Sequence, residues 1–92
     1  MRQLAAAGYE QLGQPGKAAE RYSEAAAKTT LEGERDQLFA KAARAWAVAG
    51  KKDEAIRLWR QIAAKPGNPL ENEARIRLGE LTAAPAGGAP AG

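Results

Sequence analysis

Few side chains in this 92-residue chain are suited to catalysis or metal binding. Histidine and cysteine are absent, so the usual proton shuttle near neutral pH and the thiolate ligands of zinc are both missing. Ser23 is the only serine, and it has no histidine or lysine base at a suitable spacing on its predicted helix. We therefore expect a protein that is not an enzyme and that holds no metal and no cofactor.

Two glutamate pairs and one glycine-rich turn are the remaining candidates for chemistry. Glu32 with Glu34 and Glu71 with Glu73 could act as paired acid and base. Each pair lies at the predicted start of a helix, where the helix dipole favours negative charge, so capping and solvation are the preferred interpretation. Residues 13–17 (Gly-Gln-Pro-Gly-Lys) lack the spacing and the Lys-Ser/Thr pair of a phosphate loop, which predicts a hairpin turn.

The tryptophans and the basic residues raise the question of nucleic-acid binding. Trp46 and Trp59 could stack on bases, but both lie on apolar helical stripes, which predicts that they pack in the core. The net charge of +3 is weak evidence for either interpretation. The basic residues of the C-terminal half are Lys51, Lys52, Arg57, Arg60, Lys65, Arg75 and Arg77. Binding of nucleic acid or another acidic surface through this half is the alternative function, and we favour it less than protein recognition.

The composition predicts an all-α fold. Alanine occurs 23 times and β-branched residues are scarce, which favours helices over sheets. Apolar residues recur at helical spacing in five segments, predicted as helices over residues 2–12, 15–28, 31–49, 52–65 and 69–82. Short loops make consecutive helices antiparallel neighbours. No run of 18 apolar residues occurs, so we expect no membrane insertion. Residues 83–92, which are rich in Ala, Pro and Gly, are predicted to be a disordered tail behind a domain of residues 1–82.

Turn residues mark the ends of these helices. The strong breaks are residues 13–16, 50–53 and 66–69. At the softer break near residue 29, Thr29 and Glu32 have the spacing of a capping box. At the last break, Asn68 is a predicted helix cap and Pro69 a predicted first helical residue.

An internal repeat determines the predicted architecture. At an offset of 37 residues four pairs coincide, namely Tyr9 with Trp46, Gly13 with Gly50, Ala18 with Ala55, and Tyr22 with Trp59. The repeated glycine can end the first helix of a hairpin and allow a tight turn. The repeated alanine allows the two helices to approach closely, and the second aromatic can fill the space beside the next hairpin. Such hairpins cannot bury both faces alone, so neighbouring repeats are expected to stack.

The repeat resembles the tetratricopeptide repeat family. Residues 50–56 (Gly-Lys-Lys-Asp-Glu-Ala-Ile), followed by Trp59, are similar to the turn and second helix of that family. Residues 13–25 match in the same way, and Leu78-Gly79 is similar to the pair in its first helix. The implied fold is an α-α superhelix of about five antiparallel helices, formed by two helical hairpins and a C-terminal helix.

This resemblance covers about residues 3–81 and includes departures from the family pattern. The period is 37 rather than about 34 residues, and Ala42-Ala43 stands where the family has Leu-Gly. The ending Arg-Leu-Gly-Glu-Leu (77–81) before a low-complexity tail is also similar to bacterial cell-envelope repeat proteins, of which the chain would be a C-terminal fragment.

The family resemblance implies a scaffold whose first helices line a concave groove for a peptide or partner protein. The groove-facing positions it implies are Gln3, Ala7, Glu10, Gln11, Gln37, Ala40, Arg44, Ala47, Glu73 and Ile76. The partner-binding candidates among them are Gln3, Glu10, Gln37, Arg44 and Glu73. The small alanines are expected to leave room for a ligand, and Arg44 can hold a carboxylate through two parallel hydrogen bonds. Two and a half repeats barely meet the usual minimum of about three, so the first hairpin is also a predicted surface for homo-oligomerisation.

Overall fold

The computed structural model describes residues 2–83, with the side chains of residues 2–5 and 7 left out. It contains five α-helices, α1 (Arg2–Gln11), α2 (Pro15–Lys28), α3 (Glu32–Val48), α4 (Lys52–Ala63) and α5 (Glu71–Thr82), and this part of the chain has no strand. The predicted all-α fold is therefore confirmed, and every helix begins and ends within two residues of its predicted boundary. The predicted tail lies outside the described residues from position 84 onward.

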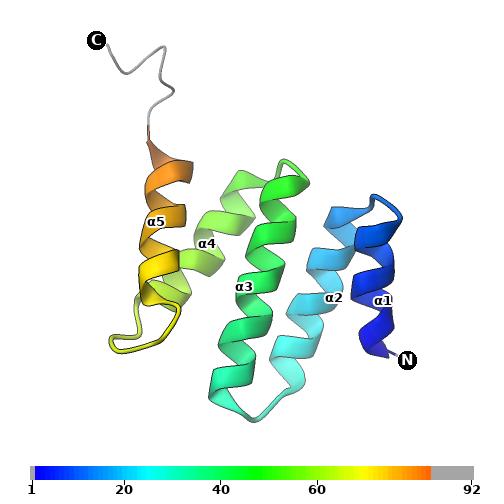
Figure 1. Ribbon diagram of the computed structural model, residues 1–92, viewed down its shortest axis with the longest axis horizontal. Coiled ribbons are helices and arrows are strands. Elements are labelled where there is room, and N and C mark those ends of the chain that lie inside the picture. The colour runs from blue at the N-terminus through cyan, green and yellow to red at the C-terminus, as the bar shows by residue number, and fades with distance from the viewer. Residues whose placement is uncertain (1, 84–92) are drawn as a thin grey trace.

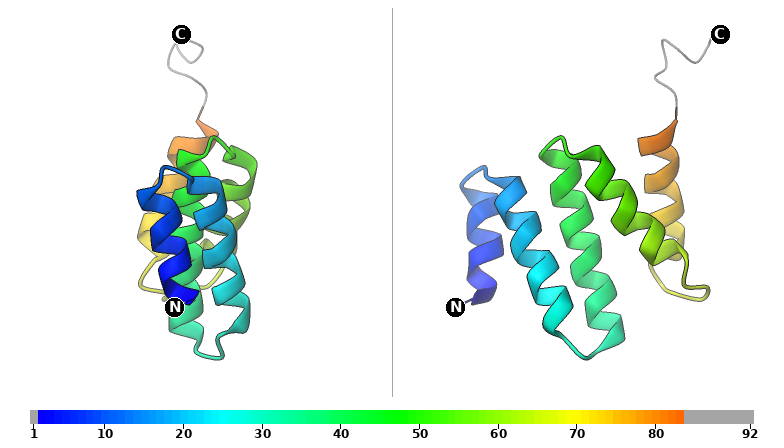
Figure 2. Two further views of the ribbon diagram at one scale, coloured as in Figure 1. Left: turned by 90° about the vertical axis from the view of Figure 1, so that its right-hand side faces the viewer. Right: turned by 180° about the vertical axis from the view of Figure 1, so that it is seen from behind.

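The helices stand side by side in chain order, and each packs against the next one (Figure 1). Seen edge-on, α1 and α5 lie toward one side of the stack and α2 and α4 toward the other (Figure 2, left). The molecule measures 49 × 33 × 15 Å, and its radius of gyration of 14.0 Å exceeds the value of about 12 Å for a compact domain of this length. The architecture is two stacked helical hairpins followed by one further helix. None of the described helices has the length and apolar character needed to cross a membrane.

The two hairpin turns repeat each other in conformation and in hydrogen bonding. Gly13 and Gly50 have φ angles of 74° and 83°, a left-handed conformation that is strained for residues with a Cβ atom. In the first turn the amide of Gln14 donates to the Tyr9 carbonyl at 2.7 Å. In the second turn the amide of Lys51 donates to the Trp46 carbonyl at 2.9 Å. Both turns are Schellman motifs, so the 37-residue repeat extends to the backbone.

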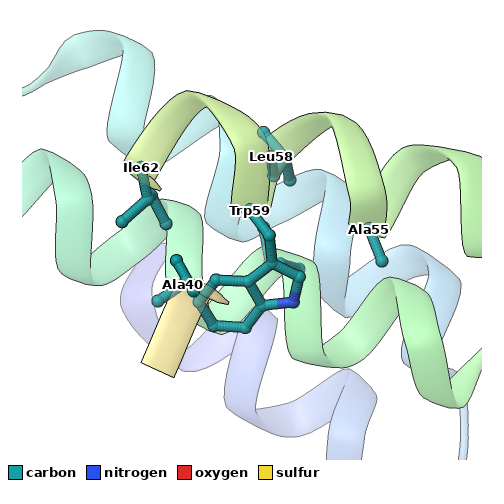
Figure 3. Packing of buried hydrophobic residues seen from close by; sticks show 8 residues of the cluster. Ala40, Ala55, Leu58, Trp59 and Ile62 are labelled. Atoms are coloured by element: carbon teal, nitrogen blue, oxygen red, sulfur yellow. The ribbon is translucent and has the colours of Figure 1, made fainter. Parts of the chain in front are cut away.

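Alanine forms most of the core because it lets helix backbones approach closely. Fully buried alanines occur on α2, α3, α4 and α5. They are Ala18, Ala19, Ala26, Ala40, Ala42, Ala43, Ala55 and Ala74. The largest buried side chains are Trp59 and Ile62 of α4, and the Trp59 ring points into this cluster beside Ala40 (Figure 3). As predicted, Trp59 is a core residue. The partly buried Trp46 packs against the core around Trp59 and against a second cluster, formed by Ala18, Ala19 and Ala45.

The structure corrects two predicted helix starts. The Thr29 hydroxyl donates to the Glu34 carboxylate at 2.6 Å, and α3 begins at Glu32 without a side-chain cap, so the predicted capping box is wrong. Asn68 does accept a hydrogen bond from the Leu70 amide at 2.8 Å, but in a turn that precedes α5. Pro69 belongs to that turn rather than to the helix, and the Asn68 side chain also donates a hydrogen bond to Asp36 of α3, as described below.

Candidate functional site

The middle of helix α3 is enclosed by its neighbours except along one strip, whereas the residues at its start (32–34) and Ala47 near its end are also exposed. The residues of this strip, which we call the α3 stripe, are Gln37, Lys41, Arg44 and Val48. Their spacing places them on one face of the helix, opposite the residues that pack against α2 and α4. Gln37, Lys41 and Val48 are exposed and Arg44 is partly exposed. The α3 stripe is thus a two-cation surface in the middle of the stack.

Aromatic rings of the neighbouring helices border the α3 stripe. The Lys41 ammonium lies 5.8 Å from the centre of the Tyr22 ring of α2, and the Arg44 guanidinium lies 5.8 Å from that of Trp59 of α4. Both distances allow cation–π attraction. The Tyr22 hydroxyl donates to the Glu10 carboxylate of α1 at 3.0 Å, and burial together with this hydrogen bond raises the pKa of Tyr22. Tyr22 and Trp59, which correspond to each other at the 37-residue offset, therefore each contact one cation of the α3 stripe.

Arg44 also forms a polar contact between two helices that are not adjacent in the chain. Its Nε and Nη2 atoms donate to the two carboxylate oxygens of Glu73 on α5, at 3.0 and 2.7 Å. The hydrogen bonds from Arg44 are the main cause that lowers the pKa of Glu73. Such paired hydrogen bonds are among the strong ones in proteins. This pair ties the first helix of one repeat to the first helix of the next.

The predicted partner-binding residues therefore have different surroundings. Glu10, Arg44 and Glu73 are engaged in contacts between helices, whereas the Gln37 side chain is exposed. The side chain of Gln3 lies outside the described part of α1. Ala40 is completely buried, so the prediction that it lines a groove is wrong. It fills the contact between α3 and its neighbours, where a larger side chain would separate the helices.

Ala47 and Ile76, two other positions implied to face the groove, are both exposed in the structure. Ala47 lies on α3 just before its end. Ile76 is 60% exposed, and its position on α5 is opposite the fully buried Ala74. It therefore belongs to the outer face of the stack and not to the surface beside α3.

One buried acidic residue, Asp36, was not identified from the sequence. Asp36 of α3 is only 7% exposed, and it accepts hydrogen bonds from Lys65 at 2.9 Å and from Asn68 at 3.1 Å. The hydrogen bond to Asp36 is the main cause that raises the pKa of Lys65. Asp36 fastens the loop between α4 and α5 to the start of α3 and so helps to position Glu73. Its place three residues before Phe39 and seven before Ala43, on one face of the predicted helix, was the available signal.

The basic C-terminal half is largely neutralised by its own carboxylates. Four of its seven basic residues form ion pairs with acidic groups: Arg57 with Glu54, Lys65 with Asp36 and Glu32, Arg75 with Glu71, and Arg77 with Glu73 and Glu80. Lys51, Lys52 and Arg60 have no ion pair within residues 2–83. Mixed charge of this kind is typical of a solvated surface rather than of a phosphate-binding patch.

The fold and this surface define an all-α protein built of stacked helical hairpins. No family model, no curated protein and no solved structure matches the chain. Within the described residues, no group of three or more acidic side chains is arranged to hold a metal ion.

Proposed function

We propose that this chain is a non-enzymatic, tetratricopeptide-repeat-like scaffold that binds a peptide or partner protein along the α3 stripe. The observation that carries the proposal is the presentation of Lys41 and Arg44 over the Tyr22 and Trp59 rings, on the exposed strip of a helix whose middle is packed between its neighbours. In the family that the sequence resembles, the first helix of a repeat supplies the binding face, and α3 has that place here.

The chemistry of the α3 stripe fits a peptide segment with a carboxylate. A long cationic side chain that is free in solution loses about 1.5–2 kcal/mol of rotamer entropy when a ligand immobilises it. Contacts with the rings and with Glu73 already restrict Lys41 and Arg44, so part of this cost falls on folding rather than on binding. Glu73 occupies two donor atoms of Arg44 and leaves the Nη1 atom for a ligand. Gln37 offers an amide donor and acceptor, and Val48 an apolar contact.

Selection of binding peptides from a random library tests this proposal. We expect selected peptides to contain acidic residues and to shift the backbone NMR signals of residues 37–48 more than those of α1. Lys41→Glu should weaken their binding by about tenfold or more, because it replaces attraction by repulsion next to the ligand. Lys52→Glu, the matched control on α4, has the same charge change at an exposed lysine outside the stripe and should leave binding unchanged. Equal affinities of the two variants would overturn the proposal.

The alternative, an acidic-surface or nucleic-acid binder, is tested by the same pair of variants. Binding through the basic half would be weakened by Lys52→Glu and would decrease steeply as salt is added. A chain that shows no affinity for nucleic acid at low salt would exclude this alternative.

A further inference from the structure

The Trp59 ring of α4 lies beside an ion pair that joins the first helices of two repeats. The Arg44 guanidinium of α3 lies 5.8 Å from the centre of this ring and donates to Glu73 of α5 at 2.7 Å. The cation and the acid next to Trp59 thus neutralise each other, and their contact connects α3 to α5.

Tyr22 of α2 corresponds to Trp59 one repeat earlier, but the two charges beside it stay apart. Its hydroxyl donates to Glu10 of α1 at 3.0 Å, and the Lys41 ammonium of α3 lies 5.8 Å from the centre of its ring. Glu10 and Lys41 form no ion pair with any side chain that the structure describes, and both are exposed. An acid and a cation therefore contact one tyrosine without neutralising each other.

Helix stability does not explain an acid at position 10. α1 ends at Gln11, so Glu10 lies in its last turn, where the helix dipole disfavours negative charge. The last turn of α1 contains no basic residue that would offset this effect. The Tyr22 hydroxyl donates to Oε1 of Glu10 only, and a carboxylate can accept several hydrogen bonds. Glu10 therefore keeps acceptor capacity for a cationic group from another molecule.

We infer that Glu10 and Lys41 together select a peptide segment with one basic and one acidic side chain, the base bound at Glu10 and the acid at Lys41. This inference rests on the proposed function, because Lys41 belongs to the α3 stripe, and it extends the binding surface across Tyr22 to the end of α1. A purely acidic segment would be attracted by Lys41 and repelled by Glu10, and a purely basic segment the reverse. Only a segment that carries both charges is attracted by both side chains.

The spacing of the two charges in the peptide follows from the tyrosine between their binding groups. Glu10 contacts the Tyr22 hydroxyl and Lys41 the Tyr22 ring, so the two groups are about one tyrosine side chain apart. In an extended peptide, every second side chain points to the same side, and two such residues are about 7 Å apart. We therefore expect the basic and the acidic residue to be separated by one residue.

Selection from one random peptide library against two forms of the 92-residue chain tests this inference. The original chain should select peptides with a basic and an acidic residue two positions apart. Glu10→Lys should instead select peptides with acidic residues at both positions, because it presents two cations. This variant should keep α1 intact, since the helix dipole favours a cation in the last turn.

Glu20→Lys is the matched control. It has the same charge change at an exposed acid of α2, two residues before Tyr22 and hence on nearly the opposite side of that helix. It should select the same peptides as the original chain. Circular dichroism of each variant verifies that the helices are intact.

The affinity of one selected peptide measures the contribution of Glu10. A peptide selected by the original chain should bind Glu10→Lys about threefold to tenfold more weakly, because an exposed attraction becomes a repulsion. Replacing the basic residue of this peptide by Glu should reverse the order of the two affinities. Within α1, only the backbone NMR signals of the last turn should shift when the peptide binds.

The outcomes separate this inference from the proposed function. Selected peptides without a basic residue, or the same peptides selected by Glu10→Lys and by the original chain, would overturn the inference. The proposed function would stand in both cases if Lys41→Glu still weakens binding. Peptides that are insensitive to Lys41→Glu, or a library that yields no binding peptide, would overturn both.

Discussion

Two glycine-to-alanine substitutions with opposite expected effects provide the sharpest test of this fold. Gly50 ends α3 with a φ angle of 83°, whereas Gly79 has ordinary helical geometry in the last part of α5. At both positions a new Cβ atom would meet nothing within 4 Å, so packing does not contribute to the difference. The backbone conformation alone should determine the sign of the change in the free energy of unfolding.

The magnitudes follow from the two conformations. At Gly50 a left-handed alanine costs about 1–2 kcal/mol. The lower entropy of the unfolded chain offsets about 0.4–1 kcal/mol of this, which leaves a net loss of about 1 kcal/mol. At Gly79 alanine should increase stability by about 0.8–1 kcal/mol, which is the difference in helix propensity. For a domain of this size, 1 kcal/mol corresponds to a change in Tm of about 4–8 °C.

Thermal and urea unfolding followed by far-UV circular dichroism measures both effects. The protein should be kept at a few micromolar, so that association between chains does not contribute. We expect Gly50→Ala to lower the Tm and Gly79→Ala to raise it. Shifts of the same sign in the two variants would refute the reasoning, since they would mean that Gly50 does not need its left-handed conformation or that α5 does not unfold with the rest of the stack.

Three further predictions concern the interior and the acid stability of the protein. Asp36→Ala should cost about 2 kcal/mol in urea unfolding, because it leaves partly buried donors without an acceptor, whereas the exposed Asp53→Ala should cost less than about 0.5 kcal/mol. Ala55→Leu should cost about 1–3 kcal/mol by overpacking a fully buried position, and Ala47→Leu on the exposed side of α3 should change little. Because the pKa of Glu73 is lowered in the folded state, its contribution to stability is present above the usual glutamate pKa of 4.5 and is lost as the pH falls through the lowered value. Unfolding of Glu73→Gln should therefore depend less on pH in this acid range, and an unchanged pH profile would contradict the assignment.

Most of the helical architecture could be predicted from the sequence because it depends on neighbours in the chain. Helical periodicity, the glycine turns and the 37-residue repeat are local patterns, and the repeat reappears in the structure as two matching turns at Gly13 and Gly50. The predicted burial of Ala18 and Ala55 is confirmed for the same reason. The helix starts near Thr29 and Asn68 were wrong in detail, since there the side chains bind partners outside the predicted caps.

The contacts of the candidate site could not be predicted in the same way. The family resemblance implied that Gln37 and Arg44 face a groove, but the sequence contains no sign that Arg44 is bound to Glu73, 29 residues later in the chain. Asp36 and Lys65 are separated by the same distance in sequence, and their pairing was missed. Which residues meet across helices depends on the rotation and crossing of whole helices, to which many small packing contacts contribute.

The sequence by itself therefore determined that this chain, which contains no histidine and no cysteine, is a set of helical hairpins. Its alanines, glycine turns and repeated aromatics determine helices and turns, and these depend mainly on residues that are close together in the chain. Only the tertiary structure decided which polar residues are free and which are used internally. It leaves Gln37 and Lys41 exposed and engages Arg44 with Glu73. The physical reason is that exposure and pairing depend on how helices pack against each other, which residues distant in the chain determine together.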